Sequence, residues 1–157
     1  MGTGSVDSDA VDWLLCRIAG CLCALPVGRV IEVMRPLPIE PLAGMPHFLC
    51  GLSIIRGLPV PVIDTGLLLS GSDTGARRFV TIMVGDRLVA LAVEQVIGIR
   101  PLAARSLSLL PPLLQKTAGD AVEAVRSLDG ELLLLLDAAR IVPKSLFDEL
   151  SSAGSPG

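Results

Sequence analysis

Two Asp-Thr-Gly triplets contain the residues of this sequence whose types suggest catalysis. They are Asp64-Thr65-Gly66, after an apolar run, and Asp73-Thr74-Gly75. Aspartic proteases place this triplet on two symmetry-related loops, where paired carboxylates share one proton and activate a water molecule. The two triplets here lie nine residues apart on one stretch of chain, so they do not form two such loops. A homodimeric, retroviral-type aspartic protease that uses Asp64 from each copy stays open as an alternative function.

The other residue types that catalyse reactions lack partners at a useful spacing. His47 is the only histidine, and no residue at a telling position completes a Ser/His/Asp or Cys/His pair with it. Glu94 and Glu123 stand without a second carboxylate at a spacing typical of acid–base pairs. We therefore expect a binding protein without enzyme activity.

The four cysteines do not form a metal-binding pattern. Cys16, Cys21, Cys23 and Cys50 match no usual zinc spacing, and His47 stands apart from them, so we predict no metal and no cofactor. Residues 1–12 contain three aspartates and no Lys or Arg, unlike the basic start of a signal peptide. We expect a cytoplasmic protein whose cysteines are reduced and mostly buried in strands.

The composition limits the classes of partner that the protein is expected to bind. Of 157 residues, 51% are hydrophobic but only 3% are aromatic, which predicts an aliphatic core. No apolar run is long enough for a membrane span, and we expect no membrane insertion. A net charge of −3, a pI near 5.1 and the lack of a basic cluster argue against nucleic acid. An apolar excess in such a chain favours contacts with protein partners.

Short apolar runs broken by glycine predict β-hairpins as the elements that position these residues. Four hairpins are expected, at residues 13–18 with 21–27, 52–55 with 58–63, 79–84 with 88–93, and 121–128 with 131–137. A short helix is expected over about residues 66–70. Prolines mark residues 36–46 as a loop that crosses between elements. Residues 101–114 are expected to form the corresponding loop in the second half of the chain.

The chain also contains an internal repeat. Ala24-Leu25-Pro26-Val27 recurs 66 residues later as Ala90-Leu91-Ala92-Val93, and the interval from Gly57 to Asp64 recurs from Gly130 to Asp137. Because closure removes exposed sheet edges, we predict a mostly β fold of two barrels of about five strands each. The expected boundaries are a disordered tail at 1–12, one unit at 13–70, a linker at 71–78, a second unit at 79–150 and a flexible tail at 151–157. Strands are free to cross over between the units, and a terminal helix is expected over residues 138–150.

Arg56 occupies an unusual place for a charged residue. It precedes Gly57 in the turn of the second hairpin, with Ile54, Ile55, Leu58 and Val60 around it. An arginine in an apolar patch can bury its stem and place five donors across an interface, which predicts a partner anchor. The alternative is a solvated turn residue, or one that pairs with a carboxylate such as Asp64.

These stretches resemble the CheW family of bacterial chemotaxis coupling proteins, from about residue 13 to about residue 142. Residues 51–64 are the most specific match, being similar to the family's Gly-Val-Ile-Asn-Leu-Arg-Gly-x-x-x-Pro-Val-x-Asp-Leu. Supporting stretches are Ala24-Leu25-Pro26-Val27, Val30-Ile31-Glu32-Val33, Pro46-His47-Phe48-Leu49-Cys50-Gly51 and Leu91-Ala92-Val93-Glu94-Gln95-Val96.

The resemblance implies two five-stranded, SH3-like β-barrel subdomains and a non-catalytic scaffold. It implies that the scaffold binds the regulatory domain of a CheA-type histidine kinase and the cytoplasmic tip of a methyl-accepting chemoreceptor. It places partner contacts at Arg56, Gly57, Gly51, Val30 and Glu32. Ile54 stands where the family usually has asparagine, inside the signature, and is included in the expected partner-binding set.

Overall fold

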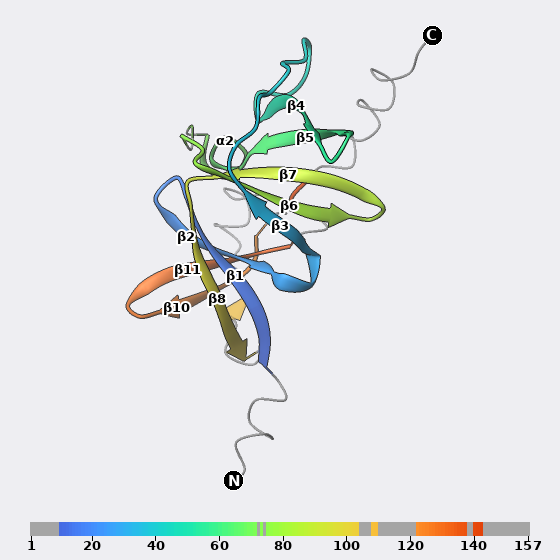
Figure 1. Ribbon diagram of the computed structural model, residues 1–157. Helices are drawn as coiled ribbons and strands as arrows, with labels where there is room; N and C mark the ends of the chain where they lie inside the picture. The colour runs from blue at the N-terminus through green and yellow to red at the C-terminus, as the bar shows by residue number, and fades with distance from the viewer. Residues whose placement is uncertain are drawn as a thin grey trace.

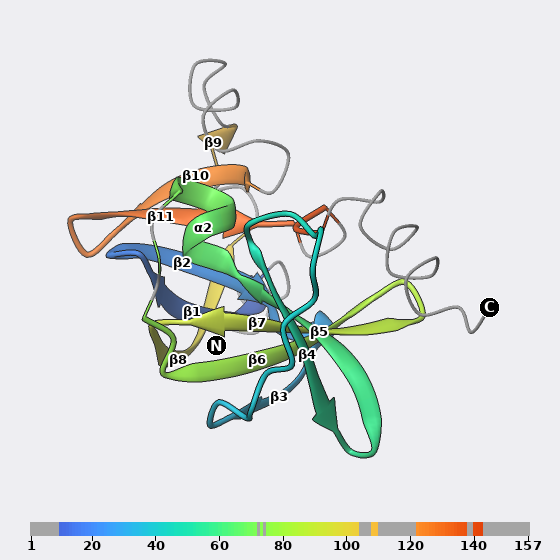
Figure 2. The same ribbon diagram turned by 90° about the horizontal axis from the view of Figure 1, so that it is seen from above.

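A computed structural model describes residues 10–71, 73, 75–103, 108–109, 122–137 and 140–142, which form a mostly β protein. Figure 1 shows two sheets stacked one above the other, and Figure 2 shows them from above. The elements in chain order are β1 (Ala10–Ile18), β2 (Cys21–Pro26), the 3-10 helix η1 (Val27–Arg29), β3 (Val30–Met34), β4 (Leu49–Ile55), β5 (Leu58–Asp64), α2 (Thr65–Ser70), β6 (Arg78–Val84), β7 (Arg87–Val93), β8 (Gln95–Ala103), β9 (Ser108–Leu109), β10 (Val122–Leu128) and β11 (Glu131–Leu136).

All four predicted hairpins are confirmed: β1–β2, β4–β5, β6–β7 and β10–β11 pair antiparallel. Three of them turn through a residue followed by glycine, and both turn residues have positive φ, as in type I′ turns. The turn residues are Ala19-Gly20, Arg56-Gly57 and Asp129-Gly130. The predicted short helix is also present, as α2.

The two sheets have equivalent strand orders, as expected for a duplicated chain. The six-stranded sheet has the order β8-β1-β2-β11-β10-β9, and the five-stranded sheet has the order β3-β6-β7-β5-β4. In the six-stranded sheet, the β1–β2 hairpin of the first half of the chain lies between β8 and the β10–β11 hairpin of the second half. In the five-stranded sheet, the β6–β7 hairpin of the second half lies between β3 and the β4–β5 hairpin of the first half. The contacts that join them are parallel, β2 with β11 and β5 with β7. Each sheet therefore contains strands from both sides of the segment 71–78.

Three expectations differ from the structure or lie outside it. One sheet has a sixth strand, the two-residue β9, where five were predicted. β1 begins at Ala10, so residues 10–12 of the expected tail pair with β8 instead. Most of the expected terminal helix, and most of residues 101–114, fall outside the described residues.

The core is aliphatic, as the composition predicts. Its largest cluster lies between the sheets and contains residues from both of them, among them Ile18, Leu25, Ile63, Leu91 and Leu136, all nearly inaccessible to solvent. A second cluster covers the opposite face of the six-stranded sheet, and a third covers the opposite face of the five-stranded sheet. Both sheets are therefore packed against aliphatic side chains.

Two cysteines belong to this core. Cys16 and Cys23 face each other across β1 and β2, and both are fully buried. Burial raises the pKa of the Cys16 thiol to about 12 and raises that of Cys23 as well. Cys21 is exposed, and Cys50 is half-buried. The described residues contain no cluster of three potential metal ligands and no helix with the length and apolar character that crossing a membrane requires.

Candidate partner-binding site

Arg56 and Glu32, two of the predicted site residues, form a bidentate ion pair. Arg56 Nε donates to Glu32 Oε1 at 2.8 Å, and Arg56 Nη2 donates to Glu32 Oε2 at 3.0 Å. Two parallel hydrogen bonds fix the plane of the guanidinium as well as its position. The Arg56 side chain nevertheless remains 73% exposed, so its outer donors face solvent.

The backbone on both sides of this ion pair is held in a specific conformation. Arg56 has a φ of 52° in its turn, a region that asparagine and aspartate adopt more easily than arginine. Glu32 follows a bulge, because the pairing of β3 with β6 shifts by one residue between Val30 and Glu32. The buried Thr81 hydroxyl accepts the Glu32 N–H at 3.1 Å and donates to the Glu32 carbonyl at 3.3 Å. Such bulges redirect side chains, and this one presents Glu32 to the hairpin.

The ion pair joins the two edges of the five-stranded sheet. β3 is one edge strand and β4 is the other, and Arg56 follows directly after β4. The sheet therefore curls until its edges approach. The alternative for Arg56 was a solvated turn residue or a pairing with a carboxylate such as Asp64. Arg56 does pair with a carboxylate, but that carboxylate belongs to Glu32 and not to Asp64. The Asp64 carboxylate instead accepts the Leu67 N–H at 3.1 Å and caps α2.

The ion pair shifts the pKa of the Glu32 carboxylate. Arg56 lowers the pKa of Glu32, first through the hydrogen bonds to its side chain and then through its positive charge. Glu32 consequently stays ionised at a lower pH than an isolated glutamate.

A pH dependence with a definite sign follows. Because its pKa is lower in the folded chain, Glu32 contributes stability that is present above the pKa of the unfolded chain and is lost as the pH falls through the folded value. We expect an NMR titration of the Glu32 carboxyl to give a lower pKa in the wild-type protein than in the Arg56→Ala variant. Equal values would contradict the ion pair in solution.

Exposed apolar side chains flank both partners of the ion pair. Ile54 and Leu58 lie on either side of the Arg56 turn and are 65% and 59% exposed. Ile31 and Val33, on either side of Glu32, are exposed as well. We call these four residues, together with Arg56 and Glu32, the hairpin–edge patch. Ile31, Val33 and Leu58 were not in the predicted set. Ile31 and Val33 share one face of β3 and Glu32 points to the other, so the patch extends around the sheet edge.

Gly51 and Val30 lie behind this surface. Val30 is half-buried and packs against the largest core cluster. Gly51 is buried in β4 with a φ of 145°, and a Cβ atom there would lie 2.1 Å from the carbonyl oxygen of Glu40. Gly57 occupies the second turn position, with a φ of 81° and open space around it. Of the six predicted residues, the structure brings Arg56, Glu32, Ile54 and Gly57 together at the surface.

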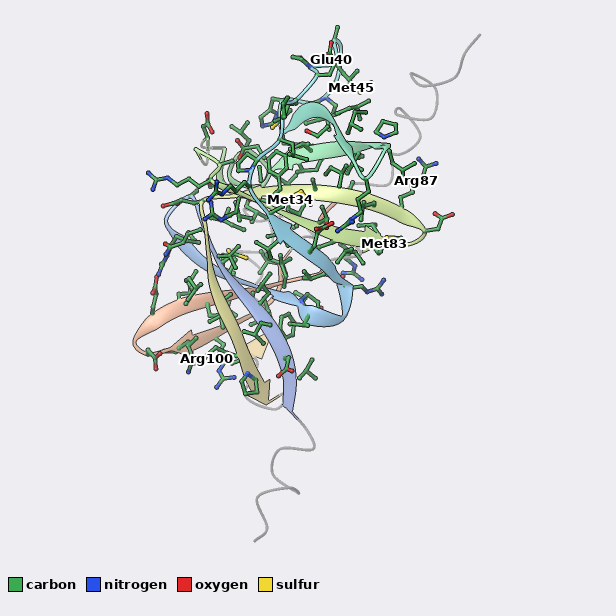
Figure 3. All side chains as sticks on the ribbon, in the orientation of Figure 1. Met34, Glu40, Met45, Met83, Arg87 and Arg100 are labelled. Carbon is green, nitrogen blue, oxygen red and sulfur yellow. The ribbon has the colours of Figure 1, made fainter. Side chains whose placement is uncertain are left out.

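The internal repeat places a related surface on the other sheet. Asp129 has the turn position that Arg56 has in the first copy, and it accepts a hydrogen bond from Arg100 of β8 at 3.4 Å. β8 is the edge strand equivalent to β3, and its exposed Ile97 and Ile99 correspond to Ile31 and Val33 at the 66-residue interval. Figure 3 shows Arg100 beside the six-stranded sheet, well away from Met34 of β3. The turn residue is basic in the first copy and acidic in the second, but its partner is not equivalent, because Arg100 corresponds to Met34 and not to Glu32 at the 66-residue interval.

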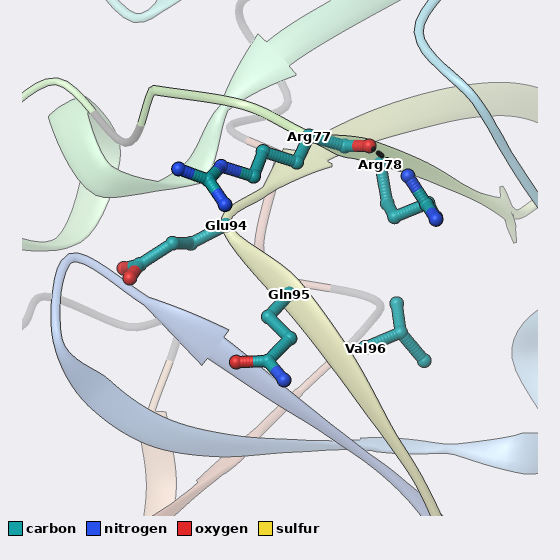
Figure 4. Close-up of a pocket in the computed structure, with 5 residues that line it drawn as sticks. All are labelled: Arg77, Arg78, Glu94, Gln95 and Val96. Carbon is teal, nitrogen blue, oxygen red and sulfur yellow. Dashed lines mark hydrogen bonds between the residues drawn. The ribbon is translucent and has the colours of Figure 1, made fainter.

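An open cavity of about 460 Å³ lies where the chain passes from β7 to β8 (Figure 4). Arg77, Arg78, Glu94, Gln95 and Val96 line it. Arg78 Nη1 donates to the Arg77 carbonyl at 2.7 Å, and the Glu94 carboxylate accepts the Gly20 N–H at 3.1 Å. None of the six predicted site residues lines this cavity.

The environment of Asp64 does not support the protease alternative. Its side chain is buried and caps α2, and the Thr65 hydroxyl donates to the Ala92 carbonyl at 2.7 Å. Asp64 is the last residue of β5, and Asp137 follows β11; these two strands pair parallel with a hairpin from the other half of the chain. They are therefore equivalent ends of two sheets, as the repeat predicts.

Comparisons with known proteins agree with this fold. A family model described as a CheW-like domain matches residues 12–145. Protein FrzA of Myxococcus xanthus is 27% identical over 131 residues, covering 80% of this chain and 81% of FrzA. The crystal structure of scaffolding protein TtCheW from Thermoanaerobacter tengcongensis matches with a TM-score of 0.77 at 20% identity, covering 87% of this chain and 95% of that one. Because the family model spans most of the sequence, this chain belongs to the CheW-like domain family.

Proposed function

We propose that this protein is a non-catalytic scaffold that couples the cytoplasmic tips of chemoreceptors to a CheA-type histidine kinase. Membership of the CheW-like family supports a scaffold role in chemotaxis-type signalling. The observation that supports the coupling of receptors to a kinase is the hairpin–edge patch, since it lies on the two stretches that resemble the family's partner-binding segments. Under this proposal the protein works in the cytoplasm, beside membrane receptors.

The chemistry of the patch suits a protein interface. Interfaces gain most of their energy from a few anchors in an apolar setting, and arginine is enriched among such anchors. The Glu32 carboxylate holds the Arg56 guanidinium in place before any partner arrives, so less side-chain freedom is lost on binding. The kinase regulatory domain is the partner that we assign to this patch.

The test is a titration of the protein with the regulatory domain of the CheA-type kinase encoded nearest in the genome. We expect Ile54→Asp to weaken this binding at least about tenfold, because a charge would replace an exposed apolar contact. Leu132→Asp is the matched control: Leu132 is 56% exposed on the six-stranded sheet, and its variant should bind within about twofold of the wild type.

Two results would count against the proposal. If the wild-type protein binds neither the kinase domain nor a soluble receptor fragment, the coupling role is wrong. If the two variants weaken binding equally, the interface does not lie at the hairpin–edge patch.

A further inference from the structure

The bulge in β3 determines the face of the sheet to which Glu32 belongs. The pairing of β3 with β6 shifts between Val30 and Glu32, so Ile31 is the extra residue. Val30 packs against the cluster between the sheets, whereas Met34 packs against the third cluster, on the opposite face of the five-stranded sheet. Residues four apart in a regular strand share one face. The bulge therefore turns the second half of β3, with Glu32, over to the face of the third cluster.

The side chain of Thr81 binds the backbone of this bulge. Thr81 is the cross-strand partner of Glu32 and is fully buried. Its neighbours Phe79, two residues before it, and Ala90, opposite it in β7, belong to the third cluster. The hydroxyl accepts the Glu32 N–H at 3.1 Å and donates to the Glu32 carbonyl at 3.3 Å. One buried hydroxyl thus holds the peptide groups on both sides of the Glu32 side chain.

The internal repeat offers a comparison, because β8 contains the same bulge without a hydroxyl. The pairing of β8 with β1 shifts between Val96 and Gly98. At the 66-residue interval Gly98 corresponds to Glu32, and its cross-strand partner Leu15 corresponds to Thr81. Gly98 has a φ of 155°, which suits glycine, so the second copy forms the bulge by backbone freedom alone. The fold therefore does not require threonine for the bulge, and the hydroxyl is found in the copy whose bulge carries a carboxylate.

We propose that Thr81 is a positioning residue of the hairpin–edge patch, whose hydroxyl holds Glu32 in the orientation from which its carboxylate binds Arg56. The two hydrogen bonds of the ion pair, at 2.8 and 3.0 Å, require the carboxylate to lie in one plane with the guanidinium. Glu32 lies on an edge strand, where only one neighbouring strand fixes the backbone. The step from Thr81 to the ion pair stands on this geometry, whereas the step from the ion pair to partner affinity rests on the proposed function.

The test replaces Thr81 by valine, which removes the hydroxyl and keeps a β-branched side chain. Without the hydroxyl, the Glu32 N–H and carbonyl lose their partner, and the bulge is no longer held in one conformation. In an NMR titration, the pKa of Glu32 should rise from its wild-type value toward that in Arg56→Ala. The affinity for the kinase regulatory domain should fall about fivefold or more, because the guanidinium is no longer fixed before binding.

Thr65→Val is the matched control, since it makes the same chemical change at an equally buried site. The Thr65 hydroxyl donates to the Ala92 carbonyl at 2.7 Å, at the end of β5 opposite to the Arg56 turn. Both valine variants should melt roughly 3 °C or more below the wild type, because each leaves a buried carbonyl without its hydrogen bond. Thr65→Val should nevertheless keep the Glu32 pKa and the kinase affinity of the wild type.

Two further substitutions at the same position complete the series. Thr81→Ser retains the hydroxyl and should restore both the Glu32 pKa and the kinase affinity to near the wild-type values. Thr81→Cys takes the place of Thr81→Val if the valine variant does not fold. A thiol of similar size donates and accepts hydrogen bonds only weakly, so Thr81→Cys should change both quantities in the same direction as valine.

The proposal is overturned if the variant without the hydroxyl keeps the wild-type pKa of Glu32, or if Thr81→Ser raises that pKa as much as valine does. It is also overturned if the pKa of Glu32 rises and the kinase affinity stays unchanged, since the ion pair would then not serve the partner. Failure of the wild-type protein to bind the kinase domain would instead contradict the coupling function, and the pKa of Glu32 would still decide whether Thr81 positions its side chain.

Discussion

Replacing Gly51 by alanine is expected to lower the free energy of unfolding by about 3 kcal/mol or more. Two costs add at this position. The φ of 145° is a conformation that residues with a side chain rarely adopt. The new Cβ would also lie 2.1 Å from the Glu40 carbonyl oxygen and 2.7 Å from the Glu40 carbonyl carbon. These atoms belong to backbone that is hydrogen-bonded to β4, since Glu40 and Leu52 exchange both N–H···O bonds.

Chemical denaturation of Gly51→Ala and Gly98→Ala separates these two costs. Gly98 has a φ of 155°, close to that of Gly51, but a Cβ there would meet no atom within 4 Å. Gly98→Ala should therefore cost only the backbone strain, about 1 to 2 kcal/mol. If both variants lost the same stability, the contact with Glu40 would not contribute to the effect.

This prediction bears on how Gly51 is interpreted. The family resemblance places Gly51 among the partner-binding residues, but its side of β4 faces the segment around Glu40 and not solvent. We expect any loss of partner binding in Gly51 variants to follow from the lost stability of the segment that carries the patch. Binding measured well below the unfolding temperature of the variant is the relevant comparison.

Local features of the fold were predictable from the sequence. A glycine between two apolar runs indicates a hairpin because the positive φ that the turn requires is easily adopted there, as at Gly20 and Gly57. Asp64 at the end of a strand predicts a helix start, since its carboxylate can cap the first N–H groups, and α2 begins at the next residue. These signals act within a few residues of one another.

The arrangement of the hairpins was not predictable in the same way. The contacts that assemble each sheet are the parallel pairs β2 with β11 and β5 with β7, which join opposite halves of the chain. Parallel pairs have no tight turn between them, so no local residue pattern marks them. The repeat predicted two equivalent units, and the structure shows that each is assembled by exchange of a hairpin between the halves.

The partner of Arg56 illustrates the same limit. Asp64 is the carboxylate near it in the sequence, whereas Glu32 lies 24 residues away. Glu32 reaches the turn because the sheet curls and because the bulge beside Thr81 shifts the register of β3. Neither the curl nor the bulge is marked by a residue pattern, although the family resemblance placed both members of the pair among the partner contacts.

Arg56→Ala is expected to weaken binding of the kinase regulatory domain by about 2 kcal/mol, or roughly 30-fold. It should change the free energy of unfolding by less than about 0.5 kcal/mol, because the Arg56 side chain is largely exposed and surface ion pairs stabilise little. The turn itself does not need arginine, since alanine occupies the same position with a φ of 50° at Ala19. Titration calorimetry and denaturation on one variant measure both quantities.

Two further variants identify how Arg56 acts. Arg100→Ala removes an exposed ion pair at the corresponding turn of the other sheet and should leave the kinase affinity within about twofold of the wild type. Glu32→Gln keeps the size of the side chain and removes its charge. If Glu32 only positions the guanidinium, Glu32→Gln should weaken binding less than Arg56→Ala, and combining both substitutions should add nothing to the loss from Arg56→Ala alone.

The alternative is that the ion pair only joins the sheet edges. In that case Arg56→Ala and Glu32→Gln would lower stability by similar amounts, and kinase affinity would stay unchanged. The observed geometry favours the anchor: the Nε and Nη2 groups bind Glu32, which leaves the remaining donors of a fixed guanidinium exposed at a turn whose neighbours Ile54 and Leu58 are also exposed. A charged group held rigid in an exposed apolar setting loses little freedom on binding, and its outer donors can pair with a carboxylate or carbonyl of the partner. A loss of affinity without a loss of stability is therefore the result that we expect for Arg56→Ala.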